Sequence, residues 1–255
     1  TLSNGDDLPL WLDISSTGTL SGTPDNGDVG SIEVTVTATD SSSASANDTF
    51  SLTVSNTNDT PVVASAIADA TATEDSAYSY DASSNFSDVD GDTLAYTATL
   101  SNGNALPVWL DISTNGTLSG TPDNGDVGAI EVTVTATDSS LAAASDTFTL
   151  SVTNTNDAPV VETTITDSST NKDATYSFDA SAHFNDVDGD TLTYTATLSN
   201  GNALPVWLDI STNGTLSGTP SNGDVGAIAV KVTATDPLSA SVSDTYTLTI
   251  NNTND

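Results

Sequence analysis

Several residue types are missing from this chain or are scarce in it. Its 255 residues include no cysteine, no methionine, no arginine, two lysines and one histidine. Without cysteine there can be no disulfide framework, no thiol nucleophile and no thiol redox switch. Aromatic residues make up only 5% of the chain, too few for the aromatic walls of a polysaccharide-cleaving cleft.

Long apolar stretches are missing as well. No run approaches the roughly 18 apolar residues that a membrane-spanning helix needs, and no charged-then-apolar signal segment stands at the start of the sequence. We therefore expect no membrane insertion in this segment. Because the chain begins within a repeat, as described below, the missing signal says little about export.

Positive charge is almost absent. Thirty-five acidic residues face two lysines, for a formal net charge of −33. Such a surface repels phosphate backbones and anionic lipid headgroups. Nucleic acid and anionic membrane are therefore excluded as expected partners.

Residues for catalysis are also lacking. The only histidine, His183, stands where the preceding repeat has Asn85, so no repeated site uses imidazole and no histidine pair can bind zinc. We interpret His183 as a surface loop residue. The serines have no repeated histidine base, and glycine patterns that bind phosphates or dinucleotides are missing. Paired carboxylates could form a glycosidase site, but the chain is predicted not to be an enzyme.

A repeat dominates what is present. Tryptophan recurs at positions 11, 109 and 207, a constant step of 98, and residues 96–122 are identical to residues 194–220. A period of about 100 residues is the size of a small domain, so the chain is an array of domains. Near-identical copies favour a role in which copy number matters over one that needs a unique pocket.

The domain boundaries follow from the same period. We predict the C-terminal part of a repeat over residues 1–59, a complete repeat over 60–157 and another over 158–255. The first repeat lacks the counterpart of 61–98. We expect the chain to be part of a longer array, and whether another chain completes the first repeat stays open.

Alternation with period two indicates strands. Phe148, Leu150 and Val152 alternate with threonine and serine, which is typical of half-buried strands, and turn residues such as Asn115-Gly116 separate the runs. The expected strands of the second repeat are 61–67, 76–82, 93–100, 108–112, 117–121, 130–138 and 146–153. The fold class is all-β: seven short alternating strands in about 100 residues imply tandem two-sheet antiparallel sandwiches of immunoglobulin-like size.

Each repeat has one tryptophan, as in Leu106-Pro107-Val108-Trp109-Leu110. It could be a stacking platform for sugar or the large central residue of a small core. The apolar neighbours favour the core.

Oxygen ligands are abundant. The sequence Asp-x-Asp-Gly-Asp at 88–92 and 186–190 places three carboxylates around a glycine turn. Calcium takes six to eight oxygen ligands, although the motif differs from an EF-hand in its glycine position and lacks the terminal glutamate. For the motif alone a solvated acidic turn is equally plausible. Further acids at Glu74, Asp138 and Asn156-Asp157 favour a metal site.

These segments resemble a known family. Phe-x-Asp-x-Asp-Gly-Asp-x-Leu-x-Tyr, Val-Thr-Ala-Thr-Asp and Asn-Thr-Asn-Asp-Ala-Pro are similar to bacterial dystroglycan-type cadherin-like repeats. The Leu-Pro-x-Trp-Leu and Gly-Thr-Leu-Ser-Gly-Thr-Pro segments are shared with related immunoglobulin-like modules. The resemblance implies a seven-strand Greek-key sandwich of cadherin or immunoglobulin type, with the domains arranged end to end and calcium ions between consecutive domains. The family is associated with secreted or surface proteins of bacteria, with adhesion and with carbohydrate contact.

The resemblance also implies which residues bind calcium. For the joint between the second and third repeats these are Glu74, an acid of the 123–126 turn (Asp126), Asn156, Asp157, Asp186, Asp188, Asp190 and Asp236. For the joint between the first and second repeats they are Asp28, Asn58, Asp59, Asp88, Asp90, Asp92 and Asp138. In the third repeat Lys172 replaces Glu74 and Ser221 replaces Asp123, so a site after it is expected to be weaker or empty.

The expected function is mechanical. Without metal, the clustered carboxylates repel one another and the linker hinges; with calcium, ligands from three segments make a stiff rod. We expect an extracellular, cell-surface or secreted bacterial adhesin or filament segment, partnered by other copies of the repeat, by neighbouring chains, or by a carbohydrate or protein receptor. The alternative is a carbohydrate-binding module array of an exported polysaccharide-degrading enzyme.

Overall fold

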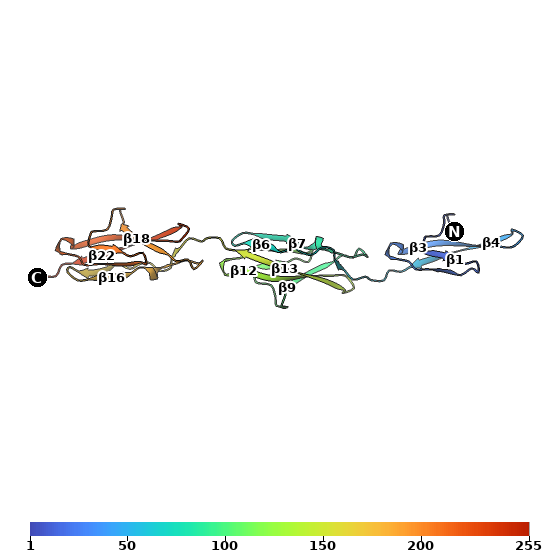
Figure 1. Ribbon diagram of the computed structural model, residues 1–255, viewed down its shortest axis with the longest axis horizontal. Coiled ribbons are helices and arrows are strands. Elements are labelled where there is room, and N and C mark those ends of the chain that lie inside the picture. Colours follow the sequence, from blue (N-terminus) through green and yellow to red (C-terminus); the bar gives the residue numbers. More distant parts are fainter. Residues whose placement is uncertain (255) are drawn as a thin grey trace. The chain divides into compact units, whose positions relative to one another are not determined.

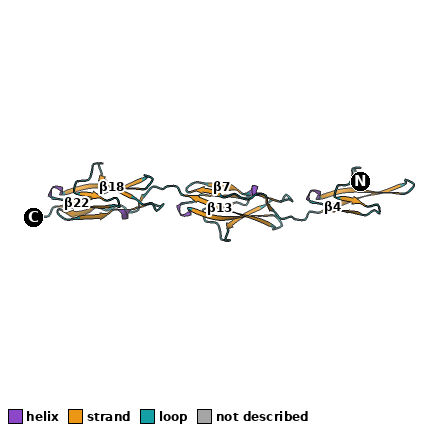
Figure 2. Ribbon diagram, viewed as in Figure 1, coloured by secondary structure: helices purple, strands orange, loops and turns teal. Residues whose placement is uncertain are grey.

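The computed structural model describes residues 1–254, and every described element is a strand or a single 3-10 turn (Figure 2). Asp255, the last residue of the expected third domain, lies outside this range. The described chain forms two compact units. The first comprises Thr1–Ala72, Ala77–Thr121 and Ala129–Ser151, and the second Thr73–Ser76, Pro122–Gly128 and Val152 onward. One end of the second repeat thus groups with the third.

The elements repeat along the chain (Figure 1). The first repeat has β1 (Leu12–Ile14), β2 (Leu20–Gly22), η1 (Asn26–Asp28), β3 (Gly30–Thr39) and β4 (Ser45–Val54). The second has β5 (Val62–Val63), β6 (Ala70–Thr73), β7 (Tyr78–Asp81), η2 (Ser83–Asn85), β8 (Phe86–Ser87), β9 (Ala95–Leu100), β10 (Leu110–Ile112), β11 (Thr117–Gly120), η3 (Asn124–Asp126), β12 (Gly128–Thr137) and β13 (Ala143–Thr153). The third has β14 (Val160–Val161), β15 (Ser168–Asn171), β16 (Tyr176–Asp179), η4 (Ser181–His183), β17 (Phe184–Asn185), β18 (Thr193–Leu198), β19 (Leu208–Ile210), β20 (Thr215–Gly218), η5 (Asn222–Asp224), β21 (Gly226–Thr235) and β22 (Ser241–Asn251).

Each complete repeat is built from the same two sheets. In the second repeat a four-stranded sheet has the order β6-β13-β12-β9 and a three-stranded sheet the order β10-β11-β7. The third repeats this with β15-β22-β21-β18 and β16-β20-β19. In the second repeat only β12–β13 and β10–β11 are neighbours both in a sheet and in sequence, so the chain crosses between the sheets at the other connections. The all-β tandem-sandwich fold class is confirmed.

The third repeat contains a strand pair that departs from the expected antiparallel arrangement. β15 runs parallel to β22, with Ser168 opposite Leu248 and Asn171 opposite Asn251. The chain enters this sheet at its edge after leaving β14, which pairs with β17 instead. The remaining neighbours of β22 and β21 are antiparallel.

The strand expected at 61–67 is wrong as a single element. Only Val62–Val63 pairs, with β8. The N–H groups of Ala64 and Ser65 instead donate to the carbonyl oxygen of Asn85 at 2.8 and 3.2 Å. Ile67 donates to Oδ2 of Asp146 at 2.6 Å. The segment therefore crosses from one sheet to the other, and one backbone carbonyl and the Asp146 side chain take the hydrogen bonds that a ladder would have made.

His183 holds the equivalent crossing in the third repeat. Its Nδ1 lies 3.0 Å from the carbonyl oxygen of Thr163 and 3.1 Å from the hydroxyl of that residue. Its ring is 5.6 Å from the ring of Phe178. His183 is half-exposed at the surface, and its imidazole also contacts Thr163 across the crossing, as Asn85 contacts Ser65 one repeat earlier.

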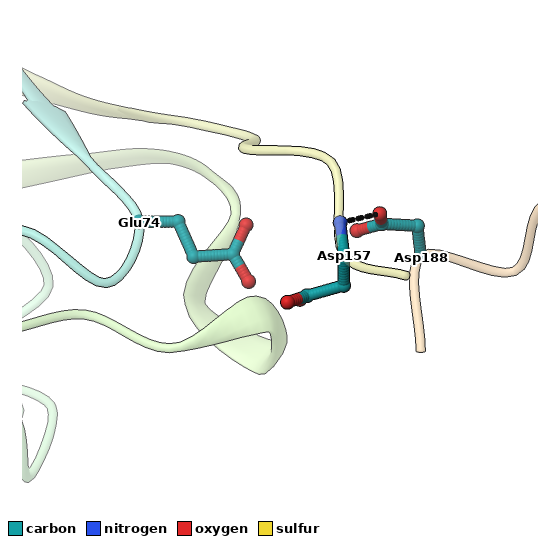
Figure 3. Close-up of side chains that lie close together, drawn as sticks. All are labelled: Glu74, Asp157 and Asp188. Carbon is teal, nitrogen blue, oxygen red and sulfur yellow. Dashed lines mark hydrogen bonds between the residues drawn. The ribbon is translucent and has the colours of Figure 1, made fainter. Parts of the chain in front are cut away.

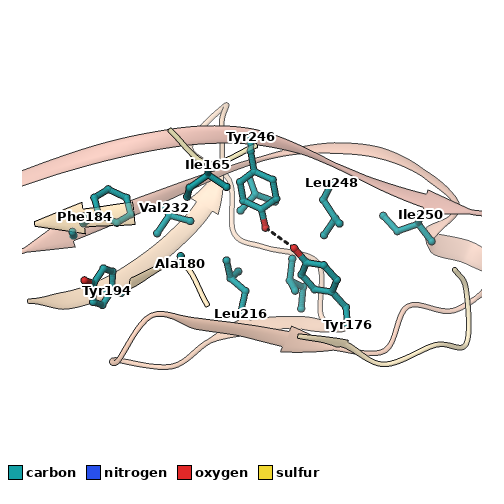
Figure 4. Packing of buried hydrophobic residues seen from close by; sticks show 13 residues of the cluster. Ile165, Tyr176, Ala180, Phe184, Tyr194, Leu216, Val232, Tyr246, Leu248 and Ile250 are labelled. Carbon is teal, nitrogen blue, oxygen red and sulfur yellow. Dashed lines mark hydrogen bonds between the residues drawn. The ribbon is translucent and has the colours of Figure 1, made fainter. Parts of the chain in front are cut away.

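The core lies between the two sheets. In the third repeat it includes Tyr176, Leu216, Val232, Tyr246 and Leu248 (Figure 4). The alternating inward positions are fully buried, and the outward ones carry threonine and serine.

The tryptophans are half-buried, and Trp207 packs against this core from its margin. The residue before each tryptophan, such as Val206, is fully exposed. The expectation of a central core tryptophan with buried neighbours therefore holds only in part.

Glycine is required where the chain passes this tryptophan. A Cβ on Gly120 would lie 1.7 Å from the carbonyl oxygen of Trp109. This approach brings β10 and β11 into register, with Leu110 opposite Gly120. The same clash would occur at Gly218 against Trp207.

Candidate metal centre

Glu74 follows β6 directly and is one of the most buried polar residues, 1% exposed. Asp75, in the left-handed conformation with φ 57°, turns the chain and donates its N–H to the carbonyl oxygen of Pro122 at 2.9 Å. Oε2 of Glu74 accepts from the N–H of Thr155 at 3.1 Å, while Oε1 has no partner among the described residues. A buried carboxylate with a vacant lone pair is costly unless a cation is supplied.

The turn before β12 contributes an amide instead of the expected carboxylate. Asp123 and Asp126 cap their own 3-10 turn: Asp123 accepts from the N–H of Gly125 at 2.9 Å, and Asp126 accepts from the N–H of Asp123 at 3.0 Å. Asn124 lies between them, and its Nδ2 donates to the carbonyl oxygen of Val187 in the third repeat. Asp126, expected as a ligand, is thus engaged within its turn.

The linker residues each contact the third repeat. Nδ2 of Asn156 donates to Oδ2 of Asp236 at 2.9 Å and to the carbonyl oxygen of Asp157 at 2.9 Å. The N–H of Asp157 donates to Oδ2 of Asp188 at 2.7 Å. Asp236 is 5% exposed and closes the tight loop after β21 by accepting from the N–H of Ala240.

The acidic loop that follows β17 is folded around its own first residue. Asp186, 7% exposed, accepts from the N–H of Asp188 at 3.0 Å. Gly189, with φ 75°, makes the left-handed turn that glycine adopts without steric cost. Oδ2 of Asp186 and Oδ1 of Asp188 are buried without partners among the described residues.

Two groups of three carboxylates result. Glu74, Asp157 and Asp188 each place one oxygen within 4.8 Å of the others (Figure 3), and Asp186, Asp188 and Asp190 do the same. Asp188 belongs to both groups. The three segments that supply them, the Glu74 turn, the linker and the acidic loop, all belong to the second compact unit.

The electrostatics reflect this crowding. Partial desolvation, followed by the charges of Asp188, Asp75 and Asp186, raises the pKa of Asp157. Desolvation and the neighbouring carboxylates likewise raise the pKa of Asp190. By contrast, the hydrogen bond from Asn156 holds the pKa of Asp236 below its usual value. The two raised pKa values thus belong to aspartates beside other carboxylates, and the lowered pKa belongs to an aspartate that accepts from an amide.

The joint between the first and second repeats has the same linker hydrogen bonds as the joint that follows it. The N–H of Asp59 donates to Asp90 at 2.7 Å, and Asn58 donates to Asp138 at 2.8 Å. Nδ2 of Asn26 donates to both Asp59 and Asp90 at 2.9 Å.

The remaining expected ligands of this joint are less well gathered. Asp88 accepts from the N–H of Asp90 and has one buried oxygen without a partner among the described residues. Asp92 accepts from the hydroxyl of Ser139 at 3.3 Å, and Asp28 caps the turn that begins at Asp25. Within residues 1–254, no three carboxylates of this joint meet the 4.8 Å distance found at the other.

Asn124 and Asn26 were missed by sequence reasoning, which considered only acids in this turn. The signal was present: Asn-Gly follows the capping residue, which is Asp25, Asp123 or Ser221, at the same place in each repeat. An asparagine flanked by two capping carboxylates is the side chain of the turn that stays free to reach outward.

The donor set fits calcium. All candidate ligands are carboxylate, amide or backbone oxygens, and the vacant oxygens are buried and converge from separate segments. Calcium prefers such hard oxygen ligands.

The fold and this acidic joint define a chain of tandem immunoglobulin-like domains. The family He_PIG, described as "Putative Ig domain", matches residues 1–55, 60–153 and 158–251, and the chain belongs to this family. No curated protein matches the sequence.

Solved structures show the same fold. Mouse cadherin-23 domains EC22-24 match with a TM-score of 0.54 at 17% identity, covering 96% of this chain and 83% of that one. Human mucin-like protocadherin EC1-2 matches with a TM-score of 0.50 at 15% identity, covering 77% and 98%. The cadherin-like sandwich is confirmed.

An endo-fucoidan hydrolase of glycoside hydrolase family 107 is 28% identical over 100% of this chain, with a TM-score of 0.38. The chain spans about two fifths of the length of the two such hydrolase structures it matches. Among residues 1–254, no helix is long and apolar enough to cross a membrane.

Proposed function

We propose that this chain is a calcium-rigidified segment of an extracellular bacterial adhesin or filament, in which each joint between repeats is stiffened by metal. The observation that carries the proposal is the convergence of Glu74, Asp157 and Asp188 from three segments. Oε1 of Glu74 and Oδ1 of Asp188 are buried there without partners among the described residues. The role is mechanical and assigns no catalytic residue. The domain boundaries at 59/60 and 157/158 belong to the same proposal, since the joints lie there.

The chain's own residues define what the joint does. Glu74 and the linker residue Asp157 belong to the second repeat, whereas Asp186, Asp188, Asp190 and Asp236 belong to the third. Bound calcium supplies the positive charge that allows these carboxylates to stay ionised side by side. In its absence their repulsion opposes the hydrogen bonds of Asn156, Asp157 and Asn124, and the linker is expected to hinge.

The acidic composition supports an extracellular location. Extracellular calcium modules bind with dissociation constants of about 10⁻⁴ to 10⁻³ M, a range matched to the calcium of seawater or body fluid. A net charge of −33 keeps the remaining surface soluble and dispersed. The expected partners are other copies of the repeat, neighbouring chains and a surface receptor.

The carbohydrate-binding alternative needs an exposed aromatic platform. The half-burial of Trp207 against the core counts against it.

The natural absence of cysteine permits a direct test. Ala105 and Ala203 are exposed and occupy equivalent places in the second and third repeats. Spin labels on the double variant Ala105→Cys/Ala203→Cys report the distance across the joint. We expect a narrow distribution in millimolar calcium and a broad one in chelator.

Two substitutions complete the test. With Glu74→Gln, the label distance distribution should stay broad in calcium. Glu162→Gln makes the same change at an exposed position outside the joint, and its distance distribution should match that of the parent. Equal distributions with and without calcium in the parent would reject the proposal.

A further inference from the structure

The end of the third repeat reproduces the backbone of the second repeat's end. The N–H of Glu74 donates to the carbonyl oxygen of Thr153 at 3.0 Å, and the N–H of Lys172, 98 residues later, donates to that of Asn251 at 3.0 Å. The residue after each turns left-handed, with φ 57° at Asp75 and 62° at Asp173. The two ends therefore offer the same position to their side chains.

The charge at that position is inverted. Lys172 is 5% exposed, so an ammonium replaces the buried carboxylate of Glu74. Its Nζ donates to Oδ1 of Asn222 at 3.4 Å. At the equivalent turn of the second repeat, Asn124 presents its Nδ2 group to the carbonyl oxygen of Val187. The amide of the third repeat is turned so that its oxygen faces the cation.

The surrounding turn has lost negative charge as well. Ser221 stands at the place of Asp123, and its hydroxyl donates to Oδ2 of Asp224 at 2.7 Å. The hydroxyl preserves the capped turn, since the N–H of Ser221 also donates to Asp224 at 2.8 Å. The turn folds as before with one carboxylate fewer, so both changes move the local charge in the same direction.

A buried ammonium requires compensating negative or polar partners. Lysine is a compact charge with three donors on a flexible stem. At the second repeat's end, the groups that meet at the Glu74 position are carboxylates of the linker and of the next repeat's acidic loop. Those carboxylates would meet a positive charge that is already part of the chain.

We propose that Lys172 is a tethered cation that takes the place of calcium, so that the end of the third repeat binds an acidic Asp-x-Asp-Gly-Asp loop without metal. This inference rests on the proposed function for its comparison, because Glu74 marks the metal-dependent version of the same end. The array thus contains two kinds of joint end, one sensitive to calcium and one insensitive to it.

The test transfers the lysine arrangement to the joint present in the chain. In the labelled full chain, Glu74→Lys/Asp123→Ser makes the second repeat's end resemble the third's. Glu74→Gln/Asp123→Ser removes the same carboxylates without adding a cation and is the matched control. Distances between the labels at positions 105 and 203 are then measured in calcium and in chelator.

We expect the lysine variant to give in chelator a distribution as narrow as the parent gives in calcium, and to change little when calcium is added. The glutamine control should be broad in both conditions. A lysine variant as broad as the glutamine control overturns the inference. If the double substitution prevents folding, judged by circular dichroism, Glu74→Lys alone provides the same comparison.

The two proposals fail separately. A change of the label distance distribution with calcium in the parent tests the proposed function. A narrow distance distribution of the lysine variant in chelator tests the tethered cation. Both proposals would be rejected if calcium leaves the parent's distance distribution unchanged and the lysine variant gives a broad distribution in chelator.

Discussion

The backbone N–H of Asp157 donates to Oδ2 of Asp188 at 2.7 Å, which joins the linker to the acidic loop of the following repeat. Asp59 and Asp90 make the same contact, also at 2.7 Å, one repeat earlier. Because a backbone donor fixes one oxygen of the loop's central aspartate, the other oxygen is directed toward the carboxylate cluster. The hydrogen bond therefore aligns a candidate ligand of the proposed calcium site.

Asp188 should be the most sensitive carboxylate of this joint, because it belongs to both groups of three. We expect Asp188→Asn to weaken calcium binding by about tenfold or more, equal to about 1.4 kcal/mol, and more than Asp190→Asn does. Isothermal titration calorimetry of the full chain measures this. Asp209→Asn, an exposed change of equal charge, should leave the titration unaltered; equal losses in all three variants would contradict the assignment.

Asn124 should contribute most to the order of the joint when calcium is absent. Its amide makes the direct hydrogen bond to Val187, and such a bond contributes about 0.5–1.5 kcal/mol. Asn124→Ala is expected to broaden the label distance across the joint in chelator and to change it little in calcium. Asn102→Ala, in an exposed loop of the same repeat, is the control. A broadening of equal size in calcium would show that the amide is part of the metal-bound joint instead.

Gly120 should tolerate no side chain. A Cβ there would lie 1.7 Å from the carbonyl oxygen of Trp109, so the strand must shift, at a cost of about 1–3 kcal/mol typical of overpacking. We expect Gly120→Ala to lower the midpoint of chemical denaturation. Gly125→Ala, whose Cβ would meet only a side-chain oxygen of Asp123 at 3.2 Å, should cost less. A denaturation midpoint for Gly120→Ala equal to or above that of Gly125→Ala would contradict the prediction.

One tyrosine hydroxyl of the second repeat is buried without a hydrogen-bond partner among the described residues, whereas its counterpart in the third repeat has two partners. The hydroxyl of Tyr78 is buried without a partner among the described residues. Its counterpart, Tyr176, lies 3.1 Å from the hydroxyl of Ser168 and 3.2 Å from that of Tyr246 (Figure 4). Phe148 occupies the place of Tyr246 in the second repeat.

Phe148→Tyr is therefore expected to stabilise the second repeat by about 1 kcal/mol. The reverse change, Tyr246→Phe, should destabilise the third by a similar amount. Thermal unfolding of each variant beside the parent measures both shifts, and a destabilising Phe148→Tyr would mean that the second repeat has no room for the hydroxyl.

The sequence predicted the sandwich well because buried strands such as 146–153 alternate so regularly. It failed at 61–67, where the apolar spacing resembles a strand although Asn85 and Asp146 take its N–H groups. Those partners lie far along the chain, so no local pattern reveals them. The carboxylate cluster of the acidic loop at 186–190 was predictable because its three aspartates lie within five residues. Asn124 was not, since its role depends on which neighbours the capping turn has already engaged.

The division of each joint among three segments affects how such an array can change in length. A repeat built like residues 60–157 gives its acidic loop to the joint before it. It gives its end, with a glutamate at the Glu74 position, to the joint after it. Any copy inserted between two others therefore completes both neighbouring joints without further substitution. Duplication of whole repeats is then structurally neutral, whereas a copy ending in a lysine such as Lys172 introduces a different coupling at one defined place in the series.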